Sequence, residues 1–158
     1  MKIRSAQKSD LTKILELNEA ALPHVSKVQI TDMARFLKQA DPFLVIEYDN
    51  EVAGFMIVLQ SGLDYSSLNY AFFVNHFENF DYVDRIVIAD PYKGKKLGTS
   101  LYDHLFKTTD KKFITCEVNV KPANPASLTF HNKLGFNQVA EQVTENGHKI
   151  VSMLVKQM

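Results

Sequence analysis

The distribution of hydrophobic and polar residues along the chain predicts short strands that alternate with amphipathic helices. Apolar residues at helical spacing predict four helices, which begin after residues 9–10, near residues 31–32, at Leu97 and after Asn124. Residues 61–79 follow neither period, are rich in aromatic residues, and are expected to be irregular. Runs of β-branched and aromatic residues predict strands at 3–6, 43–48, 51–60, 80–88, 113–120, 136–145 and 148–156.

Turn and capping residues support these boundaries. Residues 49–50 (Asp-Asn) and 146–147 (Asn-Gly) are typical of tight turns that join antiparallel strands. Asn124 followed by Pro125 indicates a helix start, because Asn accepts a bond from a free backbone N–H and Pro suits the first helical position. Gly135 indicates the end of that helix, since glycine adopts the left-handed cap conformation easily.

The predicted order of elements indicates the fold class. Strand 80–88, the helix at 97–109 and strand 113–120 form a βαβ unit, which requires a right-handed crossover between parallel strands. The flanking hairpins add antiparallel strands. We therefore expect one α/β domain over residues 1–158, with a mixed, mostly antiparallel sheet of about seven strands and about four helices.

Composition narrows the class of protein. The 158 residues are 46% hydrophobic, which is typical of a globular chain. The formal net charge is zero and the pI is about 7.0, whereas a nucleic-acid-binding surface would normally show a basic excess. Cys116 is the single cysteine, which fits a reducing compartment. With no apolar leader and no long apolar run, we expect a soluble cytoplasmic protein without a membrane partner.

The segment that follows strand 80–88 predicts an anion-binding site. Two glycines, Gly94 and Gly98, are interleaved with three lysines, and a helix pattern begins at once. The first backbone N–H groups of a helix lack internal partners, and the helix dipole favours negative charge there. The segment therefore predicts a ligand that bears phosphate. It lacks the spacing of a nucleotide P-loop.

Two segments together resemble the GCN5-related N-acetyltransferase (GNAT) superfamily. Residues 93–98 (KGKKLG) correspond to its Arg/Gln-x-x-Gly-x-Gly/Ala signature, with Lys93 in place of Arg/Gln and Lys96 in place of the central Gly. Residues 124–136 (NPASLTFHNKLGF) correspond to its second signature, with His131 where the family usually has Tyr. The chain is most similar to a branch of small predicted acetyltransferases whose acceptor the resemblance does not supply.

The resemblance implies an acetyl-CoA site. The fourth and fifth strands would splay apart around the acetyl-pantetheine arm, and an N–H near Ile88 would polarise the thioester carbonyl. Alternatives stay open: the lysines can form a solvated loop, Asn124 can act only as a cap, and Phe130 can belong to the core. The implied binding residues are Ile86, Val87, Ile88, Lys93, Gly94, Lys95, Lys96, Leu97, Gly98, Thr99, Asn119, Asn124, Phe130, His131 and Lys133.

Glu117 is the first candidate for a general base. Alternation along strand 113–120 places it on one face with Phe113, Thr115 and Asn119, and a carboxylate inside a strand this apolar costs desolvation unless it is paired or used. Its setting, Cys-Glu-Val-Asn, is similar to the Leu-Glu-Val-Arg setting of the base in ribosomal-protein alanine acetyltransferases. Asp84 on the neighbouring strand is the second candidate. Either carboxylate can instead pair with a nearby Lys or Arg.

His131 occupies the position of the family's general acid, which protonates the departing CoA thiolate. A histidine can donate a proton near neutral pH, since its ordinary pKa is about 6.5. The alternative is a hydrogen-bonding helix residue that only touches the cofactor. Cys116 is expected to be inert core, and the spacing of the other histidines predicts no metal site.

Residues 61–79 lie where the family builds its acceptor pocket. Tyr65, Tyr70 and Phe73 are candidate substrate-binding residues, although core packing explains some of these aromatic side chains. The expected partner is a small-molecule amine or a peptide, and the expected assembly is a monomer or a homodimer.

The sequence thus predicts an acetyl-CoA-dependent N-acetyltransferase, in which a primary amine of a small molecule, amino acid or peptide N-terminus attacks the thioester directly in a ternary complex. The alternative is an acyl-CoA-binding sensor without turnover, which the changes at Lys96 and His131 favour. Acetylation of aminoacyl-tRNA is disfavoured by the zero net charge.

Overall fold

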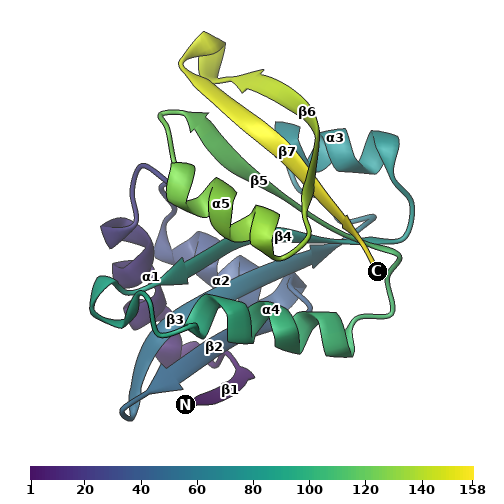
Figure 1. Cartoon of the computed structure of the whole chain (residues 1–158). Coiled ribbons are helices and arrows are strands. Elements are labelled where there is room, and N and C mark those ends of the chain that lie inside the picture. The colour runs from purple at the N-terminus through teal and green to yellow at the C-terminus, as the bar shows by residue number, and fades with distance from the viewer. The chain divides into compact units, whose positions relative to one another are not determined.

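Seven strands form one mixed sheet in the computed structural model, which describes residues 1–158 apart from the side chain of Glu145. Their order in the sheet is β1-β2-β3-β4-β5-β7-β6 (Figure 1). β4 and β5 pair in parallel, with Phe80 opposite Phe113 and Tyr82 opposite Thr115, which confirms the predicted βαβ unit. The strands are β1 (Lys2–Ser5), β2 (Phe43–Tyr48), β3 (Glu51–Gln60), β4 (Phe80–Ile88), β5 (Phe113–Lys121), β6 (Asn137–Thr144) and β7 (Lys149–Gln157).

Four of the five α-helices match the predicted ones. α3 does not, because residues 68–76 were expected to be irregular. Its sequence, LNYAFFVNH, is apolar around most of its circumference and so shows no helical period, and the Ser67 side chain caps it by accepting a bond from Tyr70 N at 3.2 Å. The helices are α1 (Leu11–Ala20), α2 (Ile30–Gln39), α3 (Leu68–His76), α4 (Leu97–Thr108) and α5 (Pro125–Lys133), and short 3-10 turns lie at η1 (Lys8–Asp10), η2 (Asp90–Tyr92) and η3 (Glu145–Gly147).

The chain divides into two compact units, which are described separately below. The first unit comprises residues 1–59 and 85–109, and the second comprises residues 60–84 and 110–158. β4 therefore contributes its first five residues to the second unit and its last four to the first. The core of the first unit includes the fully buried side chains of Ile14, Met33, Phe36, Phe55 and Leu101, and that of the second includes Phe73, Phe80, Tyr82, Ile114 and Met153.

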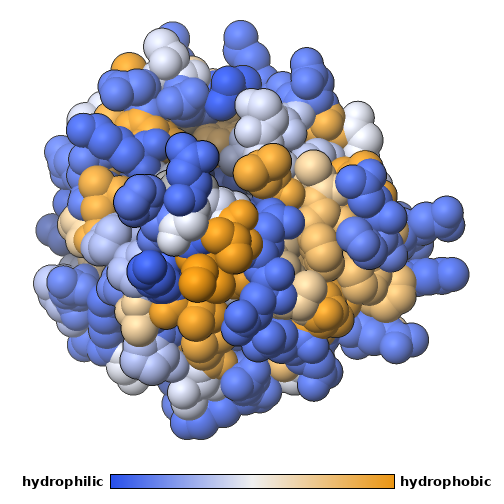
Figure 2. All heavy atoms as spheres, turned by 90° about the horizontal axis from the view of Figure 1, so that it is seen from above, coloured by the Kyte–Doolittle hydropathy of each residue, from blue (hydrophilic) through white to orange (hydrophobic). Residues whose placement is uncertain are grey.

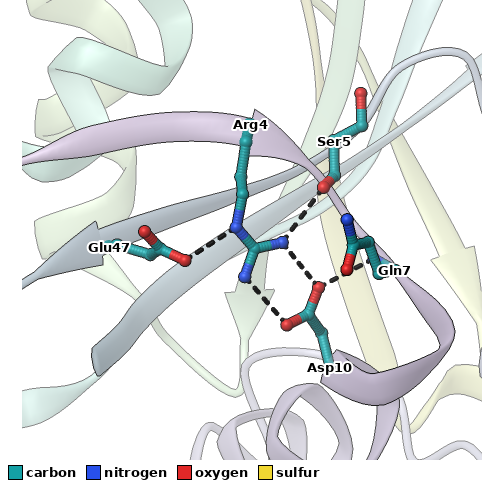
Figure 3. A network of polar contacts seen from close by, with 5 residues as sticks. All are labelled: Arg4, Ser5, Gln7, Asp10 and Glu47. Carbon is teal, nitrogen blue, oxygen red and sulfur yellow. Dashed lines mark hydrogen bonds and ion pairs between the residues drawn. The ribbon is translucent and has the colours of Figure 1, made fainter. Parts of the chain in front are cut away.

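A polar network fastens β1 within the first unit. Arg4 donates to both oxygens of Asp10, at 2.7 and 2.9 Å, and to Glu47 Oε1 at 2.7 Å (Figure 3). Asp10 also accepts a bond from Gln7 N at 2.7 Å, so that one carboxylate joins the strand to the start of η1. The Arg4 guanidinium lowers the pKa of Asp10, and the effect of this hydrogen bonding exceeds the opposing effect of burial.

The predicted turns are confirmed. Asp49 and Asn50 have φ of 52° and 62°, as a tight hairpin turn requires, and the turn between β6 and β7 contains Asn146 and Gly147 at 54° and 89°. In Figure 1 β6 and β7 lie side by side as the yellow hairpin at the C-terminal end of the chain.

Gly54 on β3 lets the end of β4 approach closely in the first unit. A Cβ at this position would lie 2.6 Å from the carbonyl oxygen of Val87 and 2.6 Å from Ile88 Cδ1. The same strands are joined where Ala89 N donates to Ala53 O at 2.8 Å. Glycine is therefore needed at this position for space rather than for backbone conformation.

The surface carries scattered apolar residues. Figure 2 shows hydrophobic residues among hydrophilic ones on one face of the molecule. In the second unit the exposed large apolar residues include Leu68 on α3 and Val139 and Val143 on β6. None of the described helices is both long enough and apolar enough to cross a membrane.

Candidate functional site

The loop before α4 has the geometry of an anion-binding site. Gly94 has φ of 80°, and Lys96 is left-handed with φ of 61° and ψ of 17° immediately before α4 begins. The N–H groups of Leu97, Gly98 and Thr99 are in the first turn of α4 and have no intrahelical acceptor. These donors, together with the helix dipole, fit the pyrophosphate that the sequence predicts.

The three lysines of this loop have different surroundings. Lys93 forms an exposed ion pair with Asp90, with 2.6 Å between Nζ and Oδ1. Lys95 Nζ lies 4.9 Å from the centre of the Tyr48 ring. Lys96 makes neither kind of contact with the residues that the structure describes. Lys96 is therefore the loop lysine whose charge is best placed to interact with an anion.

The end of β4 belongs to the first unit. Val87 is buried, while Ile86 and Ile88 are half-buried. The proximity of Gly54 to Val87 O fixes the backbone here. The roles predicted for the backbone of these residues, in holding the acyl arm and polarising its carbonyl, stay predictions.

Two carboxylates, each bonded to a tyrosine, lie in the second unit. Tyr82 donates its hydroxyl hydrogen to Glu117 Oε1 at 2.8 Å, and Tyr65 donates to Asp84 Oδ1 at 2.5 Å. Alternation places Tyr82 with Asp84 on one face of β4, and the register with Thr115 places Glu117 on the same face of the sheet. The structure thus brings together the two base candidates that the sequence suggested.

Burial raises the pKa of Glu117 to about 7, and the negative charge of Asp84 adds to this effect. The hydrogen bond from Tyr82, the nearby amide of Asn69 and the positive charge of Lys149 oppose it. Glu117 Oε2 is buried and has no hydrogen-bond partner within the described part of the chain. A carboxylate with one oxygen held and the other unpartnered, near its pKa at neutral pH, is suited to accept a proton.

Asn69, at the start of α3, is close enough to Glu117 to lower its pKa through its amide. Asn69 does not form a hydrogen bond to Glu117 Oε2, which has no partner among the described residues. Asn69 Oδ1 itself accepts a hydrogen bond from Gln142 Nε2 on β6 at 2.8 Å. A side chain from the edge strand is thus linked to the surroundings of Glu117.

α5 begins and ends as predicted. The Asn124 side chain accepts a bond from Ser127 N at 3.3 Å, which confirms its capping role, and Gly135 has φ of 88° just beyond the helix. The predicted contact of Asn124 with the cofactor stays a prediction.

His131 is buried on α5. Its Nδ1 lies 2.8 Å from Ser127 O, and because a carbonyl oxygen only accepts, this nitrogen carries the proton. Burial lowers the pKa of His131, while the bond to Ser127 acts in the opposite direction. The ring is therefore neutral near pH 7, and to act as a general acid it has to release the Ser127 bond or become protonated first. The role of general acid stays a prediction.

The three aromatic residues predicted to bind the acceptor have different surroundings: two lie in the core and one contacts a carboxylate. Phe73 is fully buried. Tyr70 is also buried, donates to Gln60 O at 2.6 Å and accepts from Leu63 N at 3.0 Å, so it organises the segment before α3. These positions favour the core alternative that the sequence left open. Tyr65 differs because it is half-buried and bonded to Asp84.

The remaining candidates lie in varied environments. Asn119 is buried on β5, Phe130 is half-buried, Lys133 is exposed, and Thr99 is half-buried in the first turn of α4. Cys116 is buried, as predicted. No group of three or more potential metal ligands is found among the described residues.

Sequence reasoning missed three polar residues around Glu117. Tyr82 could have been suggested, since it precedes Asp84 by two positions on the same strand face. Asn69 and Gln142 could not, because they are 73 residues apart and meet only through the packing of α3 and β6.

The sheet order, with one parallel strand–helix–strand connection followed by an antiparallel hairpin, defines a mixed α/β fold that a solved N-acetyltransferase structure shares. Within that class, the chain belongs to the acetyltransferase (GNAT) family, whose family model matches residues 9–136. Sequence comparison with curated proteins gives no match.

Solved structures of similar fold support this assignment. A ribosomal-protein-alanine N-acetyltransferase from Brucella melitensis has a TM-score of 0.76 at 18% identity, with 100% of both chains covered. The ribosomal-protein-S18-alanine N-acetyltransferase from Escherichia coli has a TM-score of 0.73 at 17% identity, covering 99% of this chain and 92% of that one. The putative acetyltransferase yncA from Salmonella typhimurium, solved with acetyl-CoA, has a TM-score of 0.73 at 21% identity, with 99% and 93% covered.

Proposed function

We propose that this protein is an acetyl-CoA-dependent N-acetyltransferase that acylates a primary amine and uses Glu117 as its general base. The observation that carries the proposal is the state of Glu117. Its pKa is raised to about 7, Tyr82 holds one oxygen, and the other has no partner among the described residues. A buried carboxylate in this state is suited to proton transfer near neutral pH.

The loop before α4 fits coenzyme A. Its left-handed residues Gly94 and Lys96 lead into the free N–H groups of the first turn, and Lys96 adds a positive charge. One structural neighbour, yncA, was solved with acetyl-CoA. In the proposal, residues 94–99 hold the pyrophosphate of the co-substrate through backbone donors.

Acetyl-CoA supplies the acetyl group as a thioester when it is bound. Glu117 accepts a proton from the acceptor ammonium, which frees the nitrogen lone pair. The nitrogen then forms its bond to the acyl carbon as the carbon–sulfur bond breaks, and it loses a second proton, equal in number to the one that the departing sulfur takes up. The departing sulfur takes up one proton, which in the proposal comes from His131 after its ring has become protonated. Tyr82 keeps the base oriented through its bond to Oε1.

Asp84 has two effects in this scheme. Its charge attracts an ammonium acceptor and raises the pKa of Glu117. The bond from Tyr65 fixes its orientation. A cationic amine is therefore the favoured acceptor, and peptides that begin with alanine are natural first tests, because two neighbours are described as ribosomal-protein alanine acetyltransferases.

The test is release of CoA thiol from acetyl-CoA with a panel of alanine-terminal peptides, amino acids and small amines. We expect Glu117→Gln to lower kcat/KM by roughly 10²- to 10⁴-fold, the usual contribution of a general base. Glu141→Gln, a matched change at an exposed residue of the same unit, should leave it unchanged.

Two outcomes would contradict the proposal. If no acceptor in the panel releases thiol although acetyl-CoA binds, the result counts against the enzyme and favours the sensor alternative. If Glu117→Gln turns over at the wild-type rate at every pH, then Glu117 is not the base.

A further inference from the structure

The loop that leads into α4 contains a point of high backbone freedom. Gly94 has φ of 80°, and glycine loses more conformational freedom on folding than any other residue. It lies between Tyr92, the last residue of η2, and Lys95. The loop therefore keeps one conformation in the ligand-free protein only if contacts on both sides of Gly94 hold it.

The ring of Tyr48 makes contacts on both sides of this glycine. Tyr48 is the last residue of β2, belongs to the first unit like the loop itself, and is half-buried. The centre of the Tyr92 ring lies 5.6 Å from the centre of the Tyr48 ring, at an interplanar angle of 53°. On the other side of the glycine, Lys95 Nζ lies 4.9 Å from the centre of the same ring. The Tyr48 ring thus joins the two ends of the segment 92–95.

The residues at either end of this segment are anchored by hydrogen bonds. The Tyr92 hydroxyl donates to Glu51 Oε2 at the start of β3 at 3.2 Å, and the Tyr92 N–H donates to Ala89 O at 2.9 Å. Beyond the segment, Lys96 O accepts a bond from Ser100 N of α4 at 2.9 Å. The stretch between these anchors is the one that contains the glycine and that the tyrosine ring spans.

We infer that Tyr48 is a positioning residue for the anion-binding loop, which holds Tyr92 and Lys95 so that residues 94–96 have the conformation that leads into α4 before a ligand binds. The inference deepens the proposed function and rests on it for the identity of the anion, the pyrophosphate of coenzyme A. The physical reason is preorganisation: apparent affinity falls by the fraction of molecules in which the loop has another conformation.

A competing explanation is that the Lys95 ammonium binds the pyrophosphate itself, and that Tyr48 only keeps this ammonium away from the anion. The negative face of a tyrosine ring attracts a cation, so the ring competes with an anion for the same charge. In this case, removal of the ring would release the ammonium, and acetyl-CoA would bind as tightly as before or more tightly. The positioning role predicts weaker binding.

The experiment compares Tyr48→Leu with Tyr48→Phe in the whole chain. Phenylalanine keeps the ring and both of its contacts, whereas leucine removes them. In calorimetric titration with acetyl-CoA, the dissociation constant should be roughly three- to tenfold higher for Tyr48→Leu and within about twofold of wild type for Tyr48→Phe. In steady-state assays the loss should appear in the KM for acetyl-CoA, with kcat unchanged.

Backbone order in the ligand-free protein tests the positioning role without any ligand. ¹⁵N relaxation should give lower order parameters for the amides of Gly94 and Lys95 in Tyr48→Leu than in wild type or Tyr48→Phe. Lys95→Met keeps much of the side-chain length but removes the charge, and should lower them as well. Added to Tyr48→Leu, Lys95→Met should have little further effect, because the ring that it contacts is already gone.

Phe43→Leu controls for a general loss of stability. Phe43 is the first residue of β2 and is buried, and the centre of its ring lies 6.4 Å from that of Phe55. The change removes a buried ring from the same strand and leaves the contacts of Tyr48 in place. It should lower the melting temperature without altering the dissociation constant or the order parameters of the loop.

The inference is wrong if Tyr48→Leu binds acetyl-CoA as tightly as wild type or more tightly, if Phe43→Leu weakens binding equally, or if the loop is as ordered in Tyr48→Leu as in wild type. Failure of the proposed function gives a different result. If the wild type itself does not bind acetyl-CoA, coenzyme A is not the ligand, and the order parameters still decide whether Tyr48 holds the loop.

Discussion

Lys96 is a lysine in a backbone conformation that favours glycine, at the position that corresponds to the central Gly of the family signature. It is left-handed, with φ of 61°, a conformation that glycine adopts without steric cost. A lysine adopts this conformation at a steric cost from its Cβ. Its charge then lies beside the free N–H groups at the start of α4.

We expect Lys96→Gly to raise the free energy of unfolding by about 1 kcal/mol, because the Cβ strain of a left-handed residue is removed. Acetyl-CoA affinity should stay nearly intact, since the backbone donors are unchanged. Gly94→Val should weaken it strongly, because φ is 80° at Gly94. Chemical denaturation and calorimetric titration measure the two effects.

Lys93→Gly is the control for that pair of measurements. Lys93 has φ of −60°, so a glycine there relieves no strain and only adds entropy to the unfolded chain. A gain in stability for Lys93→Gly as large as that for Lys96→Gly would contradict this explanation.

Glu117 should make the stability depend on pH in the opposite direction to a salt-bridged carboxylate. Its folded-state pKa, about 7, lies above its ordinary value of 4.5, so the folded state binds the proton more tightly. Stability should therefore fall as pH rises from about 4.5 through 7. We expect Glu117→Gln to remove this decline and to be about 1 to 3 kcal/mol more stable than wild type at pH 8.

Denaturation midpoints measured from pH 4 to pH 8 provide the test. Glu141→Gln, at an exposed position, should follow the wild-type curve. Parallel curves for wild type and Glu117→Gln would show that the carboxylate is not held in its neutral form by burial.

The base candidates could be predicted from sequence because strand alternation fixes which side chains share a face. Glu117 and Asp84 follow from this rule. The bond from Tyr65 to Asp84 and the position of Asn69 near Glu117 do not, because Tyr65 and Asn69 lie in a segment whose helix leaves no periodic signal. The proton held by His131 Nδ1 depends on the carbonyl of Ser127, which no sequence pattern reveals.

Among the elements, β3 and β4 show how a sequence can require close packing. Gly54 lies in an otherwise apolar strand, and a Cβ there would meet the carbonyl oxygen of Val87 at 2.6 Å. The predicted acyl-binding backbone at residues 86–88 depends on this contact. A substitution that adds volume at Gly54 on β3 should therefore displace the backbone of β4.

We expect Gly54→Ala to cost about 1 to 3 kcal/mol of stability, as overpacking of a buried site usually does. The displaced β4 should also lose the bond from Ala89 N to Ala53 O, so exchange of the Ala89 amide should accelerate. Hydrogen exchange followed by NMR measures this directly.

Gly62→Ala is the comparison. Its Cβ would meet nothing within 4 Å, although φ is 90°. The strain there is local, so Ala89 exchange should match wild type. Equal acceleration in both variants would mean that general loss of stability, and not the contact with Val87, is responsible.

Predictions of elements succeeded where two independent signals agreed. β2, β3 and β4 have the bounds that their β-branched runs predict, and α5 has both a cap and a terminating glycine. α3 was missed because periodicity requires a polar face, and residues 68–76 have little of one. An apolar helix and an irregular aromatic segment are alike by this criterion.

For the whole molecule, the balance of charge governs behaviour in solution. Eighteen basic and eighteen acidic residues give a formal net charge of zero at pH 7. Proteins are least soluble where their net charge vanishes. We expect a solubility minimum near pH 7, which precipitation with polyethylene glycol across pH 5 to 9 would reveal.

Lys107→Glu tests whether charge is the cause. Lys107 is exposed on α4, and the change lowers the formal charge from zero to minus two. The solubility minimum should then move to lower pH. A minimum that stays in place would point instead to association through exposed apolar residues such as those on β6.

The division of the chain into two units has a consequence for how the protein can be made or cut. The chain passes from one unit to the other between residues 59 and 60, 84 and 85, and 109 and 110. No single cut therefore separates one complete unit from the other. During synthesis the first unit stays incomplete until residue 109 has left the ribosome. By then the 25 residues 60–84 of the second unit have emerged without the rest of that unit, residues 110–158. The nascent chain should therefore remain prone to aggregation, and dependent on chaperones, until a later point in translation than a chain whose units are contiguous.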